Sequence, residues 1–261
     1  MRSLKDKVIF ITGAAGGLGQ EYVRQFLRAG ARLILTDLDG NIMQEAADQI
    51  SEQLSDAPGA IIGSFGGDIS TPDGCRDVHS KCNDMGHDID ILINNAGNIN
   101  YGLFHEIPQD KYELLMSVNL LAPMRLTHLF LPHMVGRKSG QIVFMCSVAG
   151  YIPTSLGTPY SASKFGIRGF GMGLYGELKE LGIAVTIIYP SWVNTKLLKS
   201  PEFGGASLGK LPDVLTEEPE RVVKRAVKGI SKQKLHVYPS LFSRTVWVGT
   251  KFWPIISKQA H

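Results

Sequence analysis

The chain has 261 residues, of which 44% are hydrophobic and 20% are charged, and its formal net charge is +3. These values are ordinary for a globular protein and allow one large α/β domain, residues 1–261, with a sizeable core. The mild charge, with Lys and Arg scattered along the chain, argues against nucleic-acid binding. The seven histidines and three cysteines show no His-x-x-x-His or Cys-x-x-Cys pair, so we expect no metal site.

Apolar runs and amphipathic segments alternate through the first half of the chain. Continuous apolar runs closed by turn residues are typical of buried strands, and apolar residues spaced by three and four are typical of helices. The pattern predicts strands at 8–11, 32–36, 60–62 and 89–93 and helices at 18–29, 42–54 and 71–85.

The same alternation continues through the second half. It predicts strands at 142–146, 184–189 and 235–238 and helices at 111–135, 160–181 and 217–230, with Pro123 as the point where the first of these helices could kink. Strands that alternate this regularly with helices imply a parallel sheet covered on both faces. We therefore expect an α/β doubly wound sheet, the Rossmann fold, with about seven strands.

A glycine-rich turn joins the first predicted strand to the first predicted helix. It reads Thr-Gly-Ala-Ala-Gly-Gly-Leu-Gly over residues 12–19. Glycines allow a sharp turn and bring backbone amides close to a pyrophosphate, and the positive end of the following helix attracts phosphate. We expect a dinucleotide cofactor at this turn, held by Gly13, Gly16, Gly17, Leu18 and Gly19.

Asp37 ends the second predicted strand, which follows the helix after the glycine turn. A carboxylate there accepts hydrogen bonds from the ribose hydroxyls of an adenosine and repels a 2′-phosphate. No Arg or Lys occurs at residues 14–17 or at Leu38 to offset that charge. The sequence therefore favours NAD over NADP.

Tyr160 and Lys164 stand four residues apart in a predicted helix. Positions i and i+4 share one helix face, so the ammonium can lie beneath the phenol. A nearby cation favours phenolate, so we expect Lys164 to lower the pKa of Tyr160 and make it a usable acid and base.

Further motifs follow in chain order. Asp68-Ile69 follows the third strand, Asn94-Asn95-Ala96-Gly97 follows the fourth, Ser117-Val118-Asn119 lies in the long helix, and Ser147 follows the fifth strand. Together with the glycine turn and the Tyr-Lys pair, they make the chain similar over nearly its whole length to the short-chain dehydrogenase/reductase family, in its short single-domain form.

The resemblance implies a role for each matched residue. The catalytic set would be Asn119, Ser147, Tyr160 and Lys164. Tyr160 would exchange a proton with the substrate oxygen, Ser147 would hydrogen-bond that oxygen, Lys164 would also bind the nicotinamide ribose, and Asn119 would hold a water that links Lys164 to solvent. The cofactor would further contact Asp68, Ile69, Asn95, Ala96, Gly97, Tyr160, Lys164, Pro190, Val193 and Thr195.

One position departs from the family pattern. The family usually has Pro-Gly after the sixth strand, whereas this chain has Pro190-Ser191, so we expect crowding near the nicotinamide. We expect substrate contacts from residues 98–101 and 148–151, from Thr158 and Trp192, and from a lid at 196–215. The aromatic and leucine side chains in these segments favour an apolar substrate.

The C-terminal segment, residues 240–258, combines aromatic and basic residues. Arg244, Lys251 and Lys258 recur every seven residues among apolar neighbours. A helix of this kind suits a membrane interface, a second subunit or a cap over the substrate site, and the sequence leaves these three alternatives open.

The hypothesis that joins these features is an NAD(H)-dependent oxidoreductase that interconverts a hydrophobic secondary alcohol and its ketone. A narrower alternative is a sterol, retinoid or fatty-acyl dehydrogenase attached to membranes by its C-terminal segment. An alternative of another class is a non-catalytic NAD(H) sensor. We expect a homodimer or homotetramer from the resemblance, and a cytoplasmic or peripheral membrane location, since residues 1–7 show no secretory signal.

Overall fold

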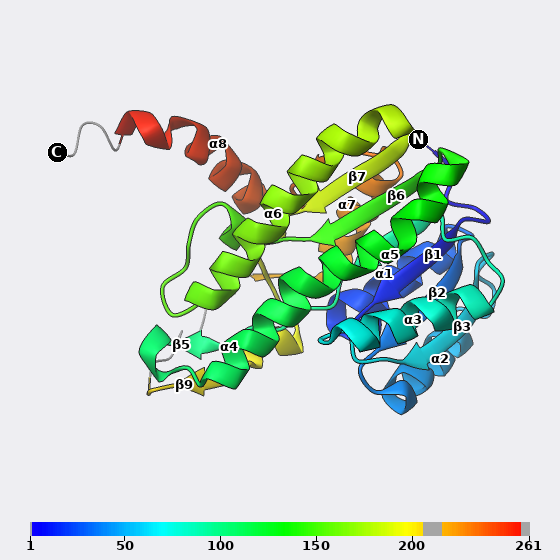
Figure 1. The fold of residues 1–261 in the computed structure, drawn as a ribbon, viewed down its shortest axis with the longest axis horizontal. Coiled ribbons are helices and arrows are strands. Elements are labelled where there is room, and N and C mark those ends of the chain that lie inside the picture. The colour runs from blue at the N-terminus through cyan, green and yellow to red at the C-terminus, as the bar shows by residue number, and fades with distance from the viewer. Residues whose placement is uncertain (1, 206–215, 257–261) are drawn as a thin grey trace.

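The computed structural model describes residues 2–205 and 216–256, and its centre is a seven-stranded parallel sheet (Figure 1). The strand order is β11-β7-β6-β4-β1-β2-β3. The strands are β1 (Val8–Thr12), β2 (Arg32–Asp37), β3 (Ala60–Gly66), β4 (Ile91–Asn94), β6 (Gly140–Met145), β7 (Ile183–Ile188) and β11 (His236–Val237). The predicted doubly wound fold with about seven strands is confirmed.

Helices cover both faces of this sheet (Figure 1). Alternate side chains of β1 supply the two cores: Ile9 and Ile11 pack on one face, and Val8 and Phe10 pack on the other. The first face carries α1 (Gly17–Arg28), α2 (Gly40–Gln53) and α7 (Pro219–Ile230), and the second carries α3 (Pro72–Asp84), α5 (Ala122–Arg137) and α6 (Thr158–Leu178).

The strand order reverses between β1 and β4, because the chain runs outward from β1 to β3 and then returns to the other side of β1. In open α/β sheets the crevice at the carboxyl ends of the strands, at such a reversal, is the usual ligand site. The glycine turn after β1 and the Asn95 segment after β4 both lie at this edge.

The long helix predicted at 111–135 is made of three pieces. A π-helical turn, η2 (Ser117–Leu121), separates α4 (Gln109–Met116) from α5. Pro123, which has no N–H, is the second residue of α5, so the irregularity lies just before the expected kink. The whole run, Gln109–Arg137, is long and apolar enough to span a membrane, as core helices of soluble proteins also are, and it packs against α3 and α6.

Several predicted boundaries were wrong. The third strand continues to Gly66, because β3 is an edge strand that pairs only with β2 and needs no continuous apolar run. The fourth strand begins at Ile91 rather than at residue 89. The helix expected from residue 217 begins at Pro219, because Thr216–Glu217 forms β10 beside β8 (Trp192–Val193).

Two segments of the predicted lid are described. The 3-10 turn η5 (Lys196–Lys199) is followed by β9 (Glu202–Phe203), which pairs with β5 (Tyr101–Gly102). The rest of the predicted lid, residues 206–215, lies outside the described residues. The basic-aromatic segment forms α8 (Leu241–Ile256), which leads outward from the body of the protein (Figure 1), and residues 257–258 lie outside the described part.

Candidate active site

Two adjoining cavities lie at the carboxyl edge of the sheet. The first is a groove lined by residues from the turn after β1, the ends of β2 and β3, and the segment after β4. The second lies beside it and is lined by residues after β6 and β7 and by α6. Both cavities share Leu18, Asn95, Gly97, Thr195 and Leu197, so they are continuous with each other.

The groove has the form that a dinucleotide requires because glycine backbones make its floor. Gly13 has a φ of +64°, and a Cβ there would lie 2.7 Å from the Ala96 Cα. A Cβ on Gly19 would lie 2.1 Å from the Gly13 carbonyl oxygen. Any side chain at these positions would push apart the turn that presents backbone amides to a phosphate.

Asn95 fastens the segment after β4 to this turn. Its Nδ2 donates to the carbonyl oxygens of Thr12, at 3.0 Å, and Gly13, at 2.9 Å. The Thr12 hydroxyl in turn accepts from the backbone N–H groups of Asn95 and Ala96. The two segments predicted to contact the cofactor are therefore braced against each other.

Acidic side chains line the far end of the groove. The Asp37 carboxylate accepts hydrogen bonds from the backbone N–H of Ala15, at 2.9 Å, and from that of Leu38, at 2.8 Å. Asp68 accepts from the N–H of Ser70 at 2.9 Å. Both carboxylates and Ile69 line the groove, at the positions expected to contact an adenosine.

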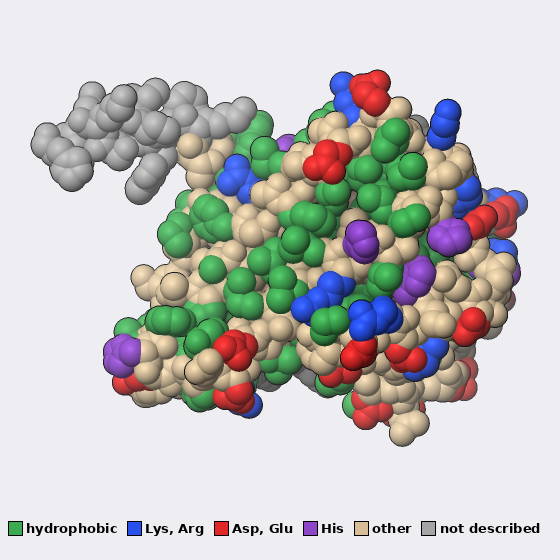
Figure 2. Space-filling view, viewed as in Figure 1, with side chains coloured by type: hydrophobic (Ala, Val, Ile, Leu, Met, Phe, Trp, Pro, Cys, Tyr) green, Lys and Arg blue, Asp and Glu red, His purple; other side chains and the backbone are tan. Residues whose placement is uncertain are grey.

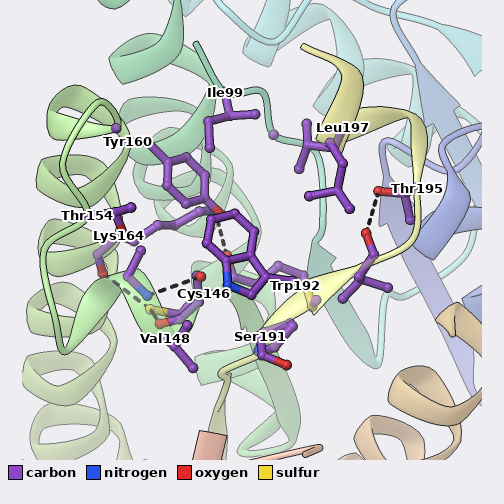
Figure 3. A pocket seen from close by; sticks show the side chains of 18 of the residues that line it. Ile99, Cys146, Val148, Thr154, Tyr160, Lys164, Ser191, Trp192, Thr195 and Leu197 are labelled. Atoms are coloured by element: carbon purple, nitrogen blue, oxygen red, sulfur yellow. Dashed lines mark hydrogen bonds between the residues drawn. The ribbon is translucent and has the colours of Figure 1, made fainter. Parts of the chain in front are cut away.

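The second cavity brings together three of the four predicted catalytic side chains, Ser147, Tyr160 and Lys164. Figure 3 shows Tyr160 and Lys164 at this cavity. Ser147 follows β6, whereas Tyr160 and Lys164 lie on one face of α6. The Lys164 Nζ is 5.4 Å from the centre of the Tyr160 ring, and it donates to the Met145 carbonyl oxygen at 2.8 Å. The predicted stacking of ammonium and phenol is therefore present.

Residues 7–202 match the model of the short chain dehydrogenase family. The mouse epidermal retinol dehydrogenase 2 is 31% identical over 245 residues, which cover 92% of this chain and 76% of the mouse protein. The estradiol 17-beta-dehydrogenase 11 of Pongo abelii is 31% identical over 243 residues, or 92% and 77% of the two chains. A short-chain dehydrogenase from Sphingobium yanoikuyae in complex with NADPH has a TM-score of 0.79 and 26% identity over 96% of this chain and 95% of its own.

The chain belongs to the short-chain dehydrogenase family. It is thus an oxidoreductase with a nucleotide-binding fold.

The fourth residue of the family's catalytic set, Asn119, lies behind the cavity wall. It is 2% exposed within the π-helical turn η2. Its Oδ1 accepts from the N–H of Asn98 at 2.9 Å, and its Nδ2 donates to the Asn98 carbonyl oxygen at 2.9 Å and to the Ser163 hydroxyl at 3.2 Å. Asn119 therefore joins the segment after β4 to α6, a pairing of distant segments that sequence spacing does not reveal.

Burial shifts the titration of the pair in a way the sequence did not predict. It raises the pKa of Tyr160 above its ordinary value, and a hydrogen bond with Ser147 only partly opposes this rise. It also lowers the pKa of Lys164 to about 8. The expectation that Lys164 lowers the Tyr160 pKa was therefore wrong for these side-chain positions, because desolvation dominates.

The buried Lys164 should make the free energy of unfolding depend on pH. Between its folded pKa of about 8 and its ordinary value of 10.5, the unfolded chain binds more protons than the folded one. Stability should therefore rise with pH across that window. From pH 7 to pH 9.5, urea unfolding of wild type should gain on the order of 2 kcal/mol relative to Lys164→Met. A difference between the two proteins that stays constant with pH would contradict this assignment.

The family's usual glycine is replaced by Ser191, yet the structure accommodates its side chain. The hydroxyl lies 3.2 Å from Glu217 Oε2 and 3.2 Å from Ser240 Oγ, on β10 and at the start of α8. The Ser191 side chain, expected to crowd the nicotinamide, is thus held by hydrogen bonds that link the cavity wall to the C-terminal elements. Pro190, Val193 and Thr195, which are predicted to contact the cofactor, line the cavity.

Apolar side chains make most of the remaining wall (Figure 3). They come from the predicted substrate segments and from β8, and include Ile99, Tyr101, Val148, Trp192, Leu197 and Leu198. Thr158, which we expected at the site, is not among the lining residues, whereas Cys146 and Thr154 are. The sequence signal for Cys146 at the cavity was its position directly before Ser147, a predicted catalytic residue.

Proposed function

We propose that the protein is an NAD(H)-dependent oxidoreductase that interconverts a hydrophobic secondary alcohol and its ketone. The observation that carries this proposal is the apolar cavity in which Ser147, Tyr160 and Lys164 converge, continuous with the glycine-floored groove. In this proposal residues 1–261 act as one catalytic domain. Measuring NADH consumption with a graded panel of apolar ketones tests it, and a lack of turnover with every ketone would oppose it.

In the direction of reduction, Tyr160 donates its phenolic proton to the substrate oxygen while the Ser147 hydroxyl hydrogen-bonds that oxygen. In oxidation the same two groups act in reverse, and Tyr160 takes the proton. Both side chains line one cavity, and Ser147 favours the phenolate form of Tyr160. The nicotinamide, when bound, supplies the hydride donor or acceptor and, when oxidised, a positive charge that favours the phenolate.

Lys164 and Asn119 support this proton transfer in different ways. Lys164 is 5% exposed and holds its ammonium under the Tyr160 ring, where it would bind the nicotinamide ribose. Asn119 fixes the backbone of Asn98, which follows Gly97 in the chain. The Cα of Gly97 faces both the Asn119 amide and the Lys164 ammonium. Asn119 thereby sets the space around Lys164 through which a water relays protons to solvent.

We further propose that the cofactor is NAD rather than NADP, because the Asp37 carboxylate lines the groove and repels a 2′-phosphate. Asp37→Asn keeps an oxygen for the Ala15 N–H but removes the charge. Its ratio of NADPH to NADH affinity should rise at least about tenfold, equivalent to about 1.4 kcal/mol. Fluorescence titration with both cofactors measures this ratio, and Asp39→Asn, which changes a helix-capping carboxylate nearby, is the matched control. An unchanged ratio would show that the Asp37 charge does not determine the choice between NAD and NADP.

A sterol or retinoid alcohol is the narrower candidate for the substrate. The aromatic and branched wall of Tyr101, Val148 and Trp192 suits a bulky apolar ring system. The names of the similar retinol and estradiol dehydrogenases favour the same class. Including a steroid ketone, a retinoid aldehyde and a long-chain acyl ketone in the panel separates these substrates from simpler ones.

We propose a homodimer or homotetramer in which α5 and α6 form the contact. Hydrophobic side chains gather over these helices in Figure 2, and Met124, Phe165, Met172 and Tyr175 are 37–44% exposed there.

Phe165→Lys combined with Met172→Lys should therefore shift the protein towards monomer, because two charges would be buried at the contact. Analytical ultracentrifugation measures the change. The matched control is Leu103→Lys with Phe104→Lys, at exposed positions of another segment. An unaltered assembly in the α6 variant would place the contact elsewhere.

A further inference from the structure

Acidic and basic residues are distributed unevenly along the chain, although the net charge is only +3. None of the 24 acidic residues occurs after Glu220, whereas nine of the 27 Lys and Arg residues do. The segment after Glu220 therefore carries a formal +9, and the chain up to and including Glu220 carries −6. The sequence-based description of scattered basic residues was wrong for this region.

Much of this charge lies on one face of α7 and on the turn after it. The helix buries Val222, Val223, Ala226 and Ile230, the last three of them in the core beneath this face of the sheet, and a basic set faces solvent at helical spacing. The exposed set is Arg221, Lys224, Arg225 and Lys228, continued by Lys232 and Lys234. Among the described residues no acidic side chain forms an ion pair with these six cations.

The start of α8 is attached to this basic face. The Arg225 guanidinium donates to the Pro239 carbonyl oxygen. Ser240 and Ser243 then cap the helix reciprocally: the N–H of Ser243 donates to Ser240 Oγ at 2.8 Å, and the N–H of Ser240 donates to Ser243 Oγ at 3.0 Å. The residue pair that precedes α8, Pro239 and Ser240, is therefore tied to α7 on one side and to the first turn of α8 on the other.

From its first turn onward, α8 exposes apolar side chains. Leu241 is 75% exposed, Phe242 44% and Val248 45%, and the basic Arg244 is exposed between them. The opposite face is anchored, since Val246 is 9% exposed and the Trp247 ring lies 5.2 Å from the Tyr238 ring. Over residues 241–250 the helix thus keeps its outer apolar side chains in solvent while its inner face is packed.

We propose that α7 and α8 together form a docking surface for an anionic lipid bilayer. Exposed Lys and Arg attract acidic headgroups, and adjacent Leu, Phe and Val side chains enter the boundary between headgroups and acyl chains. A nucleic acid would use the same cations but would leave Leu241 and Val248 without an apolar partner. This proposal concerns location and does not depend on the proposed reaction.

Vesicle sedimentation with the full-length protein tests the proposal. Wild type should bind vesicles of phosphatidylcholine that contain phosphatidylserine as the minor lipid, release in high salt, and leave pure phosphatidylcholine vesicles largely free. Each Lys or Arg near such a surface contributes about fivefold in affinity. Lys224→Gln with Lys228→Gln should therefore weaken binding by roughly 25-fold.

The matched control is Arg76→Gln with Lys111→Gln, which removes two exposed charges. These residues lie on α3 and α4, which are not among the helices on the same face of the sheet as α7. It should change binding by less than about twofold. Leu241→Glu with Val248→Glu should weaken binding at least about tenfold, because two carboxylates would meet acidic headgroups. Unchanged thermal unfolding and NADH affinity would show that each variant is folded.

Three results would overturn the proposal. One is wild-type protein that binds neither kind of vesicle. Another is a control variant that loses as much affinity as the α7 variant. The third is a Leu241→Glu, Val248→Glu variant that binds vesicles like wild type; a changed mass in solution would then assign α8 to a second copy of the chain.

Discussion

Replacing Tyr160 with Phe should lower kcat by roughly 10²–10⁴-fold, the usual contribution of a positioned acid or base. The phenylalanine ring keeps the packing above the Lys164 ammonium, which lies 5.4 Å from the centre of the tyrosine ring. Only the phenolic hydroxyl is lost, and with it the transferable proton and the interaction with Ser147. NADH affinity should therefore stay within about twofold while turnover falls.

Tyr175→Phe is the matched control for this experiment. Tyr175 lies on the same helix, α6, but is 37% exposed and does not line the cavity. The same loss of one hydroxyl should leave kcat within about twofold there. If Tyr160→Phe turned over at the wild-type rate, the assignment of Tyr160 as acid and base would be wrong.

Gly19→Ala should have the second large effect, on cofactor binding and on folding together. A Cβ on Gly19 would lie 2.1 Å from the Gly13 carbonyl oxygen and 2.7 Å from the Ala14 Cα, both of which are backbone atoms. The turn must therefore open. We expect NADH affinity to fall by more than about tenfold and stability to fall by roughly 1–3 kcal/mol, as for other overpacked sites.

Gly173→Ala makes the same chemical change without a clash, since a Cβ there meets no atom of the described residues within 4 Å. It lies inside α6, where replacing Gly by Ala favours the helix by up to about 1 kcal/mol. Equilibrium unfolding and NADH titration of both variants measure the contrast. Equal NADH affinity in Gly19→Ala and wild type would show that the turn does not hold the cofactor.

The sequence predicted the central sheet well because its strands are continuous apolar runs. Ile9, Phe10 and Ile11 are fully buried, as such a run requires in a sheet covered on both faces. It failed for β3, where Gly63 and Gly66 interrupt the apolar pattern at the sheet edge. The two-residue pairs β5–β9 and β8–β10 join segments that are far apart in the chain, and no local periodicity reports such contacts.

Most of the predicted site residues line the two cavities because ordered motifs sit at the ends of neighbouring parallel strands. The motifs could not predict how burial shifts the pKa values of these residues. The rise in the Tyr160 pKa and the fall in the Lys164 pKa depend on how completely the folded chain excludes water from this pair. In the same way, the contacts of Asn119 with Asn98 and Ser163 depend on packing between distant segments.

Hydride transfer at an alcohol carbon can be followed by the transfer of an isotope label. NADH deuterated at the transferring position is incubated with the panel of apolar ketones, and the alcohols are analysed by mass spectrometry. At least one product should carry one deuterium at its carbinol carbon, and the Tyr160→Phe variant should not form this labelled product. Saturable NADH binding without label in any product, across sterol, retinoid and acyl substrates, would instead indicate a non-catalytic NAD(H) sensor.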